Sequence, residues 1–216
     1  MAQDYASSIN GQFIRVTRLN ADGTLATSVS ASYGMKSFIS VSFTPEYEEG
    51  DEITQKNAAG EVCATFQSPD TLKRVTLEVA ICDPDPEFTW VAAGGTLLTT
   101  AGKNVGWKSP AQGIDALPYG VALDVWSLAI NNGKAATTGG RYWHWVFPYA
   151  MLRPSGDRVI ENGLLANTFE GWGVGNSGYG DGADNQWLWG APDSPYQYAR
   201  TDSIPTLTNG FLAVTP

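Results

Sequence analysis

The stretch that decides the fold is "RVTLEVAICDPDPEFTWVAAGG", residues 74–95. In its first half, apolar residues alternate with polar ones, so that one face carries Val75, Leu77, Val79 and Ile81. A period of two is typical of an antiparallel strand that is buried on one face and solvated on the other. The first half of the stretch therefore predicts a half-buried β-strand.

The second half of the stretch predicts one short helix over residues 84–94. Asp85 can cap the N-terminus, and Pro86 suits the first helical position because proline lacks the N–H that is unpaired there. Gly94 can end the helix in a conformation that other residues avoid. A strand that leads directly into a capped helix is thus expected.

The period of two recurs in other segments that are rich in β-branched and aromatic residues, namely 13–19, 38–43, 120–130 and 141–147. Turn signals such as "NADG", "AAGE" and "NNGK" separate several of these segments. We therefore expect an all-β fold with one short helix: a single domain over residues 1–216, built as an antiparallel β-sandwich or partly closed barrel with the helix at its flank.

Three segments lack the pattern of sandwich strands. They are a long acidic loop at 44–61, a Gly- and aromatic-rich loop at 171–198 and a C-terminal arm at 201–216. Long excursions from a compact β core usually bind something. We therefore expect extended loops and terminal arms that make contacts outside the domain.

Composition and charge exclude several function classes. The formal net charge is −9 and the isoelectric point is about 4.5, which argues against a protein that grips nucleic acid through phosphate contacts. The first residues, "MAQDYASSINGQF", have no secretion signal, and no apolar run is long enough for a membrane span. Without a secretory signal, Cys63 and Cys82 are expected to be reduced, buried thiols in strands.

No motif predicts catalysis, a cofactor or a metal. "GWGVGNSGYGDG", residues 171–182, matches G-x-G-x-x-G, but the residues after it cannot start the helix whose N–H groups would bind phosphate. Two cysteines and one histidine are too few for a recognised zinc site, and no G-x-S-x-G elbow supplies a nucleophile. His144, between two tryptophans, is expected to be a packed side chain.

The densest cluster of charges has several interpretations. Its members are Glu46, Glu48, Glu49, Asp51 and Glu52. A pair of carboxylates could serve a glycoside hydrolase, but such a pair needs one pKa raised by burial. Five neighbouring acids on a long connection favour a solvated surface, with a cation site as the next possibility.

The aromatic residues also have two interpretations. The chain has eight Trp and nine Tyr, several of them in "NQWLWGAPDSPYQY", residues 185–198. They could stack on sugars, as in a carbohydrate-binding β-sandwich with Trp187 and Trp189 as its platform. They could equally anchor one protein chain on another, since Trp and Tyr are frequent hot-spot residues. Composition does not separate these alternatives.

The order of the segments resembles the major tail tube proteins of long-tailed (siphovirus-like) bacteriophages, especially those that infect actinobacteria. The segments are 13–25, 34–66, 72–95 and 161–175, and the resemblance covers roughly residues 11–175. Its most specific parts are "EGDEITQKNAAGEVC" and the unit of strand, "DPDPEF" and helix.

The resemblance implies a structural protein of the virion tail, made in the host cytoplasm. Hexameric rings would stack into a tube with an acidic lumen, and one sheet would continue around that lumen. Loops and arms would reach the next ring. The implied partners are further copies of the chain, a tape-measure protein, and tail terminator and tail-tip proteins. DNA would pass through the lumen without specific binding.

The resemblance also assigns candidate contacts. The segment 44–61 is similar to a long hairpin that family members use between neighbours or rings, which places Glu46, Glu48, Glu49, Asp51 and Glu52 against another subunit or near the lumen. Candidates for an inter-ring or outer surface are Trp172, Tyr179, Trp187, Trp189 and Tyr196. A carbohydrate-binding module for adhesion or host recognition is the alternative function.

Overall fold

A computed structural model describes residues 6–115, 117–131, 133–137, 139–155, 167–187, 189–190 and 192–215. The strands are β1 (Ser7–Arg18), β2 (Ser32–Met35), β3 (Phe38–Glu48), β4 (Glu52–Lys56), β5 (Val62–Gln67), β6 (Thr71–Ile81), β7 (Thr96–Thr100), β8 (Lys103–Lys108), β9 (Val121–Asn131), β10 (Lys134–Ala135), β11 (Tyr142–Ser155), β12 (Asn167–Val174), β13 (Gln197–Thr201) and β14 (Gly210–Phe211). The helices are α1 (Pro86–Ala93) and the 3-10 helices η1 (Ser177–Tyr179) and η2 (Ala183–Asn185).

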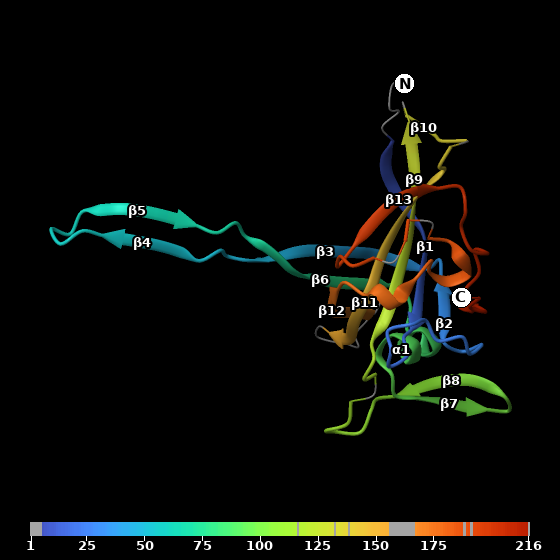
Figure 1. Ribbon diagram of the computed structural model, residues 1–216. Helices are drawn as coiled ribbons and strands as arrows, with labels where there is room; N and C mark the ends of the chain where they lie inside the picture. Colours follow the sequence, from blue (N-terminus) through green and yellow to red (C-terminus); the bar gives the residue numbers. More distant parts are fainter. Residues whose placement is uncertain are drawn as a thin grey trace, which may run out of the picture.

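Most strands belong to one antiparallel sheet with the order β14-β2-β1-β9-β11-β12-β6-β3, in which β10 pairs with β9 and β13 with β11 (Figure 1). The sheet is open, with β14 and β3 at its two ends. Its apolar residues form one main core that takes side chains from β1, β2, β9, β6, β12 and α1. The expectation of an all-β fold with one short flanking helix is confirmed.

The long strand β11 divides the sheet. Its first half pairs with β13, its second half pairs with β12, and the register against β9 shifts between Phe147 and Ala150. Pro148 lies within this shift, and its missing N–H cannot take part in a regular ladder. Along one edge, β11 therefore pairs first with β13 and then with β12.

The strand and helix of the deciding stretch form as expected. Val75, Leu77, Val79 and Ile81 on β6 are all buried. The Asp85 carboxylate accepts hydrogen bonds from the backbone N–H groups of Glu87 and Phe88, and Gly94 ends α1 with a φ of 72°. The Tyr33 hydroxyl also donates to Asp85, at 2.7 Å, so the cap ties α1 to β2. Both predictions are confirmed.

Loss of this cap has a measurable cost. We expect Asp85→Ala to lower the free energy of unfolding by about 1–2 kcal/mol, because two helix N–H groups and the Tyr33 hydroxyl lose their acceptor. Urea unfolding followed by circular dichroism measures the change. Asp83→Ala, at an exposed position two residues earlier, is the control and should change it by less than about 0.5 kcal/mol. Equal values for the two variants would contradict the role of the cap.

Two segment predictions need correction. Residues 44–48 belong to β3, and Glu52–Lys56 form β4 against β5, so the segment 44–61 is largely one side of a β-hairpin. Residues 201–215 do not extend as an arm: β14 pairs with β2, Val214 is buried, and the Thr215 N–H donates to Asp184. Edge pairing and burial hold this segment on its own domain.

Smaller differences concern the other loop and the cysteines. Residues 171–174 complete β12, and the described residues between β12 and β13 contain η1 and η2. Cys63 and Cys82 are free thiols, but both are exposed, because β5 has no covered face and Cys82 follows the end of β6. Their predicted burial was wrong. In the described part of the chain, no helix has the length and apolar character to cross a membrane.

Candidate functional site

The most exposed part of the chain is a ribbon that we call the arm, residues 48–72. In Figure 1 it projects to the left, far from the body of the domain, with β4 and β5 as its outer part. Every residue of β4 and β5 is exposed. A two-stranded ribbon with no covered face is at best marginally stable in water. The arm is therefore a surface that a partner would stabilise.

The outer arm has one apolar face. Ile53 pairs with Phe66, and the same face continues to Ala64, opposite Gln55. Ile53 and Phe66 are 64% and 62% exposed, and the nearby Val62 is exposed as well. The opposite face carries Glu52, Thr54, Thr65 and Gln67. Adjacent exposed apolar side chains of this size make the face a candidate contact surface.

The predicted acidic residues run from the end of β3, through the root of the arm, to the first residue of β4. Glu46 pairs with Arg74, and Glu48 lies 3.9 Å from Lys73. Glu49, Asp51 and Glu52 are exposed. Counted over the whole arm, six acidic residues (Glu48, Glu49, Asp51, Glu52, Glu61, Asp70) stand against Lys56 alone, which gives a formal charge of −5. That these residues meet another subunit or the lumen stays a prediction.

The predicted aromatic surface divides into exposed and buried residues. Trp189 is 65% exposed, Trp172 is 37% exposed and Tyr196 is half-buried. Tyr179 and Trp187 are buried, so their assignment to an outer surface was wrong for this chain. Both belong to a second apolar cluster, with Leu19 and Leu25 of the turn after β1 and with residues of β9 and β11. This cluster fixes the loop after β12 on the sheet.

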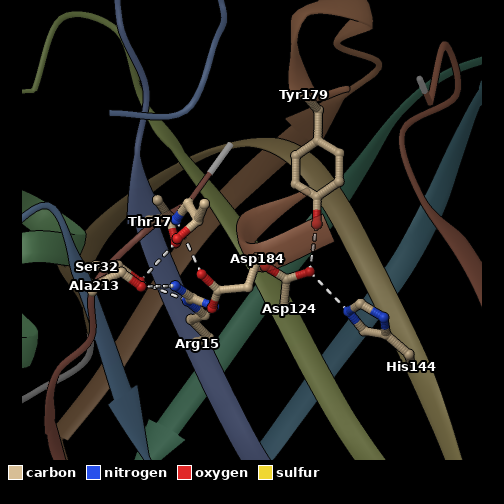
Figure 2. A network of polar contacts seen from close by, with 9 residues as sticks. Arg15, Thr17, Ser32, Asp124, His144, Tyr179, Asp184 and Ala213 are labelled. Atoms are coloured by element: carbon tan, nitrogen blue, oxygen red, sulfur yellow. Dashed lines mark hydrogen bonds and ion pairs between the residues drawn. The ribbon is translucent and has the colours of Figure 1, made fainter. Parts of the chain in front are cut away.

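A buried polar network lies beside that cluster (Figure 2). Asp124 on β9 accepts a hydrogen bond from the Tyr179 hydroxyl at 2.6 Å, and it pairs with Nε2 of His144 at 2.8 Å. The His144 ring stacks on Trp126, with 4.3 Å between centroids. His144 is thus a packed side chain, as predicted. The network fastens η1 to β9 and β11.

A second part of the same network surrounds Arg15, which has no exposed surface. Its guanidinium donates to Asp184 Oδ2 at 2.7 Å, to Ser32 Oγ at 2.7 Å and to the Ala213 carbonyl at 2.9 Å. These bonds join β1 to η2 and to the C-terminal segment. Arg15 therefore holds two distant segments on the sheet.

The buried phenol groups of Tyr179 and Tyr33 make the free energy of unfolding depend on pH in the alkaline range. Burial first, and then the Asp124 carboxylate, raises the pKa of Tyr179, and burial and Asp85 likewise raise the pKa of Tyr33. The folded state favours the neutral phenols, while the unfolded chain ionises near pH 10. Their contribution is therefore complete below about pH 10 and is lost as the pH rises further.

We expect the melting temperature of the wild type to fall more steeply between about pH 9 and 11 than that of Tyr179→Phe, which has no hydroxyl to ionise. Differential scanning calorimetry across this range measures both slopes. Tyr119→Phe, at an exposed tyrosine, is the control and should follow the wild type. Parallel slopes for all three proteins would contradict the assignment.

The solvent face of β3, β6, β12 and β11 forms a shallow groove of about 730 Å³. Its lining includes three hydroxyl residues, Ser42, Thr44 and Thr76, for which we call it the hydroxyl-rich groove, together with Glu78, Met151 and Trp172. Two arginines also line it, and both are paired with carboxylates: Arg74 with Glu46, and Arg153 with Glu170 at 2.8 Å. Each arginine of this face is therefore matched by a carboxylate, and the face has no excess of positive charge.

The described residues contain no group of three or more His, Cys, Asp or Glu side chains placed to hold a metal ion. The acidic cluster at the arm root lies on an exposed ribbon rather than around a shared centre. The candidate contact surfaces described above are the arm, the sheet edges and the hydroxyl-rich groove.

Comparison with known proteins gives weak likenesses. No protein-family model matches the sequence, and neither does any curated protein. The structure is similar to the tube-terminating cap of the anti-feeding prophage, with TM-score 0.39 and 10% identity over 93% of this chain and 95% of that chain. It is also similar to a chain of the baseplate of that particle, with TM-score 0.28 and 12% identity over 76% and 90% of the two chains. Likenesses with TM-scores under 0.5 do not assign a function.

Proposed function

We propose that the chain is a self-assembling subunit of a phage tail tube, in which rings of six copies stack around a lumen. The observation that carries this proposal is the arm, a ribbon of exposed apolar and acidic residues on a domain whose core is already complete. The ring of six, the tape-measure, terminator and tip partners, and the place in the virion tail come from the sequence resemblance.

The open sheet supports assembly. Within the described residues, β3 pairs only with β6, so one edge of an 11-residue strand has no strand beside it. A bare edge is a template for pairing with another chain, and closing strands into a ring of copies removes that liability. β13, beside β11, has a similar free edge in the described chain.

The hydroxyl-rich groove supports a place at the lumen. DNA is held mainly by Lys and Arg on its phosphates, and each neutralised phosphate strengthens binding. Arg74 and Arg153 each contact a carboxylate, so this face offers a phosphate little net attraction. A lumen wall with this surface would let DNA pass without binding it, as a channel for DNA requires.

The proposal is tested by the assembly state of the purified full chain. We expect sedimentation velocity to give large particles at high protein concentration, and negative-stain microscopy to show rings or tubes of uniform diameter. A protein that stays monomeric at every concentration would contradict the proposal. The carbohydrate-binding alternative predicts a small particle whose Trp fluorescence shifts with a glycan. Burial of Trp187 leaves that alternative only half of its expected platform.

Removal of the paired carboxylates tests the groove. We expect tubes of Glu46→Gln with Glu170→Gln to retain short duplex DNA in co-sedimentation at about 20 mM salt and to release it near 200 mM, because Arg74 and Arg153 become free to bind phosphate. Asp83→Asn with Asp193→Asn removes the same number of charges at exposed positions outside the groove and the arm, and should retain no DNA. Equal retention by the two double variants would place the groove away from the DNA path.

A further inference from the structure

A second exposed ribbon lies on another side of the domain. β7 and β8 pair as a separate two-stranded hairpin beside α1 (Figure 1). Its inner face packs on the body, where the Trp107 indole N–H donates to the Gly94 carbonyl at 2.7 Å. Asn104 donates to Glu87 on α1. These contacts fix the hairpin on the domain and leave its other face outward.

The outward face combines an apolar centre with positive charge. Leu98 lies over Gly106 and is 47% exposed. The pairing places Lys103, opposite Thr100, and Lys108, opposite Thr96, on this same face. Residues 94–108 contain these two lysines and no acidic residue, so the ribbon has a formal charge of +2.

The arm and this ribbon are complementary. The arm has a formal charge of −5 and an apolar face centred on Ile53 and Phe66. Asp51 precedes Ile53 by two residues, and its backbone carbonyl accepts a hydrogen bond from the Ser68 N–H, so the strand pairing extends to this residue. The Asp51 carboxylate therefore lies on the same side of the ribbon as Ile53, next to the apolar face and toward the root of the arm. Apolar contact in the middle with opposite charges beside it is the pattern of a specific interface.

The arm does not meet the β7–β8 hairpin of its own chain. The arm points away from the β7–β8 hairpin of its own chain (Figure 1), and all residues of β4 and β5 are exposed. About twelve extended residues on each side give the arm a reach of about 40 Å. A contact between different surfaces of two copies repeats head to tail, and it closes a ring or extends a filament according to the rotation between the copies.

We propose that the arm of one copy docks on the outward face of the β7–β8 hairpin of another copy, with Ile53 and Phe66 against Leu98. Lys103 and Lys108 then lie near the acidic root of the arm. This inference rests on the proposed self-assembly and deepens it by naming the two surfaces that meet.

Charge reversal tests the docking. We expect Lys103→Glu with Lys108→Glu to raise the critical concentration for assembly at least about 10-fold, because two attractive contacts become repulsive. Glu49→Lys with Asp51→Lys should do the same, and the quadruple variant should return to within about 3-fold of the wild type. Lys36→Glu with Lys134→Glu, at exposed lysines elsewhere, is the control and should assemble normally.

The outcomes separate the two proposals. A wild type that never assembles overturns both of them. A wild type that assembles, together with a Lys103→Glu and Lys108→Glu variant that assembles equally well, overturns the docking and leaves self-assembly standing. Far-UV circular dichroism establishes that each variant is folded.

Disulfide trapping gives a second measurement that leaves the charges intact. In a chain with Cys63→Ala and Cys82→Ala, Ala64→Cys lies on the apolar face of the arm and Thr100→Cys on the outward face of the hairpin. Oxidation of assembled protein with copper phenanthroline should give a ladder of linked chains on a non-reducing gel. Thr99→Cys, which faces the other way, replaces Thr100→Cys in the control and should give little ladder. Equal ladders from the two pairs would contradict the docking.

Discussion

A chain without its arm should remain a folded monomer that forms no tubes. The cross-strand pair of Glu48 and Thr71 allows residues 49–70 to be replaced by a two-residue Asn-Gly turn that joins β3 directly to β6. None of the removed residues belongs to the core, so the melting temperature should change by only a few degrees. Assembly should be lost completely because the apolar face is gone.

Sedimentation velocity and negative-stain microscopy measure this result on the shortened and full chains at equal concentration. Thr54→Ala with Thr65→Ala alters the polar face of the arm alone and is the matched control, which should still assemble. Normal tubes from the shortened chain would show that the arm has no part in assembly.

Arg15→Met should have the largest effect on stability. The variant removes the buried donor to Asp184, Ser32 and the Ala213 carbonyl. Because the Asp184 side chain is 36% exposed and Ser32 keeps its hydrogen bond with Thr17, the free energy of unfolding should fall by about 2–3 kcal/mol. The C-terminal segment should also detach before the sheet unfolds, since its anchor on β1 is lost.

Urea unfolding measures the free energy, and hydrogen exchange of the backbone N–H groups of Leu212 and Thr215 reports detachment of the segment. Arg153→Met removes an arginine whose side chain is 78% exposed, so its pair with Glu170 should contribute at most about 1 kcal/mol. An Arg15→Met variant as stable as Arg153→Met would contradict the clamp.

The parts of the fold that sequence predicts are those set by local patterns. The alternation on β6 follows from a sheet with one buried face, and α1 follows from a cap, a proline and a stopping glycine within eleven residues. His144 as a packed residue follows from its aromatic neighbours in a strand pattern. In each case the residues that decide the structure are close together in the chain.

The parts that sequence does not predict depend on distant contacts or on the absence of a core. The arm strands have no buried face, so their residues lack the alternation that marks a strand, and the segment reads as an acidic loop. Trp187 and Tyr179 look exposed in a Gly-rich loop, but their partners Asp124 and His144 lie on β9 and β11. Arg15 meets Asp184 across 169 positions, and no local pattern signals this pair.

The candidate surfaces follow the same division. Sequence identified the acidic segment at 44–61 as a surface of interest, and the structure shows it on an exposed ribbon. The outward face of β7 and β8 could not be predicted from the sequence, because Lys103, Lys108 and Leu98 share one face only through the pairing of the two strands.

The most direct test of self-assembly through the arm is an electron cryomicroscopy reconstruction of the particles that the purified full chain forms. The account predicts a hollow tube of constant diameter in which each ribbon at 48–72 is covered by a different copy. Isolated domains with that ribbon uncovered, or particles in which it lies free in solvent, would contradict it.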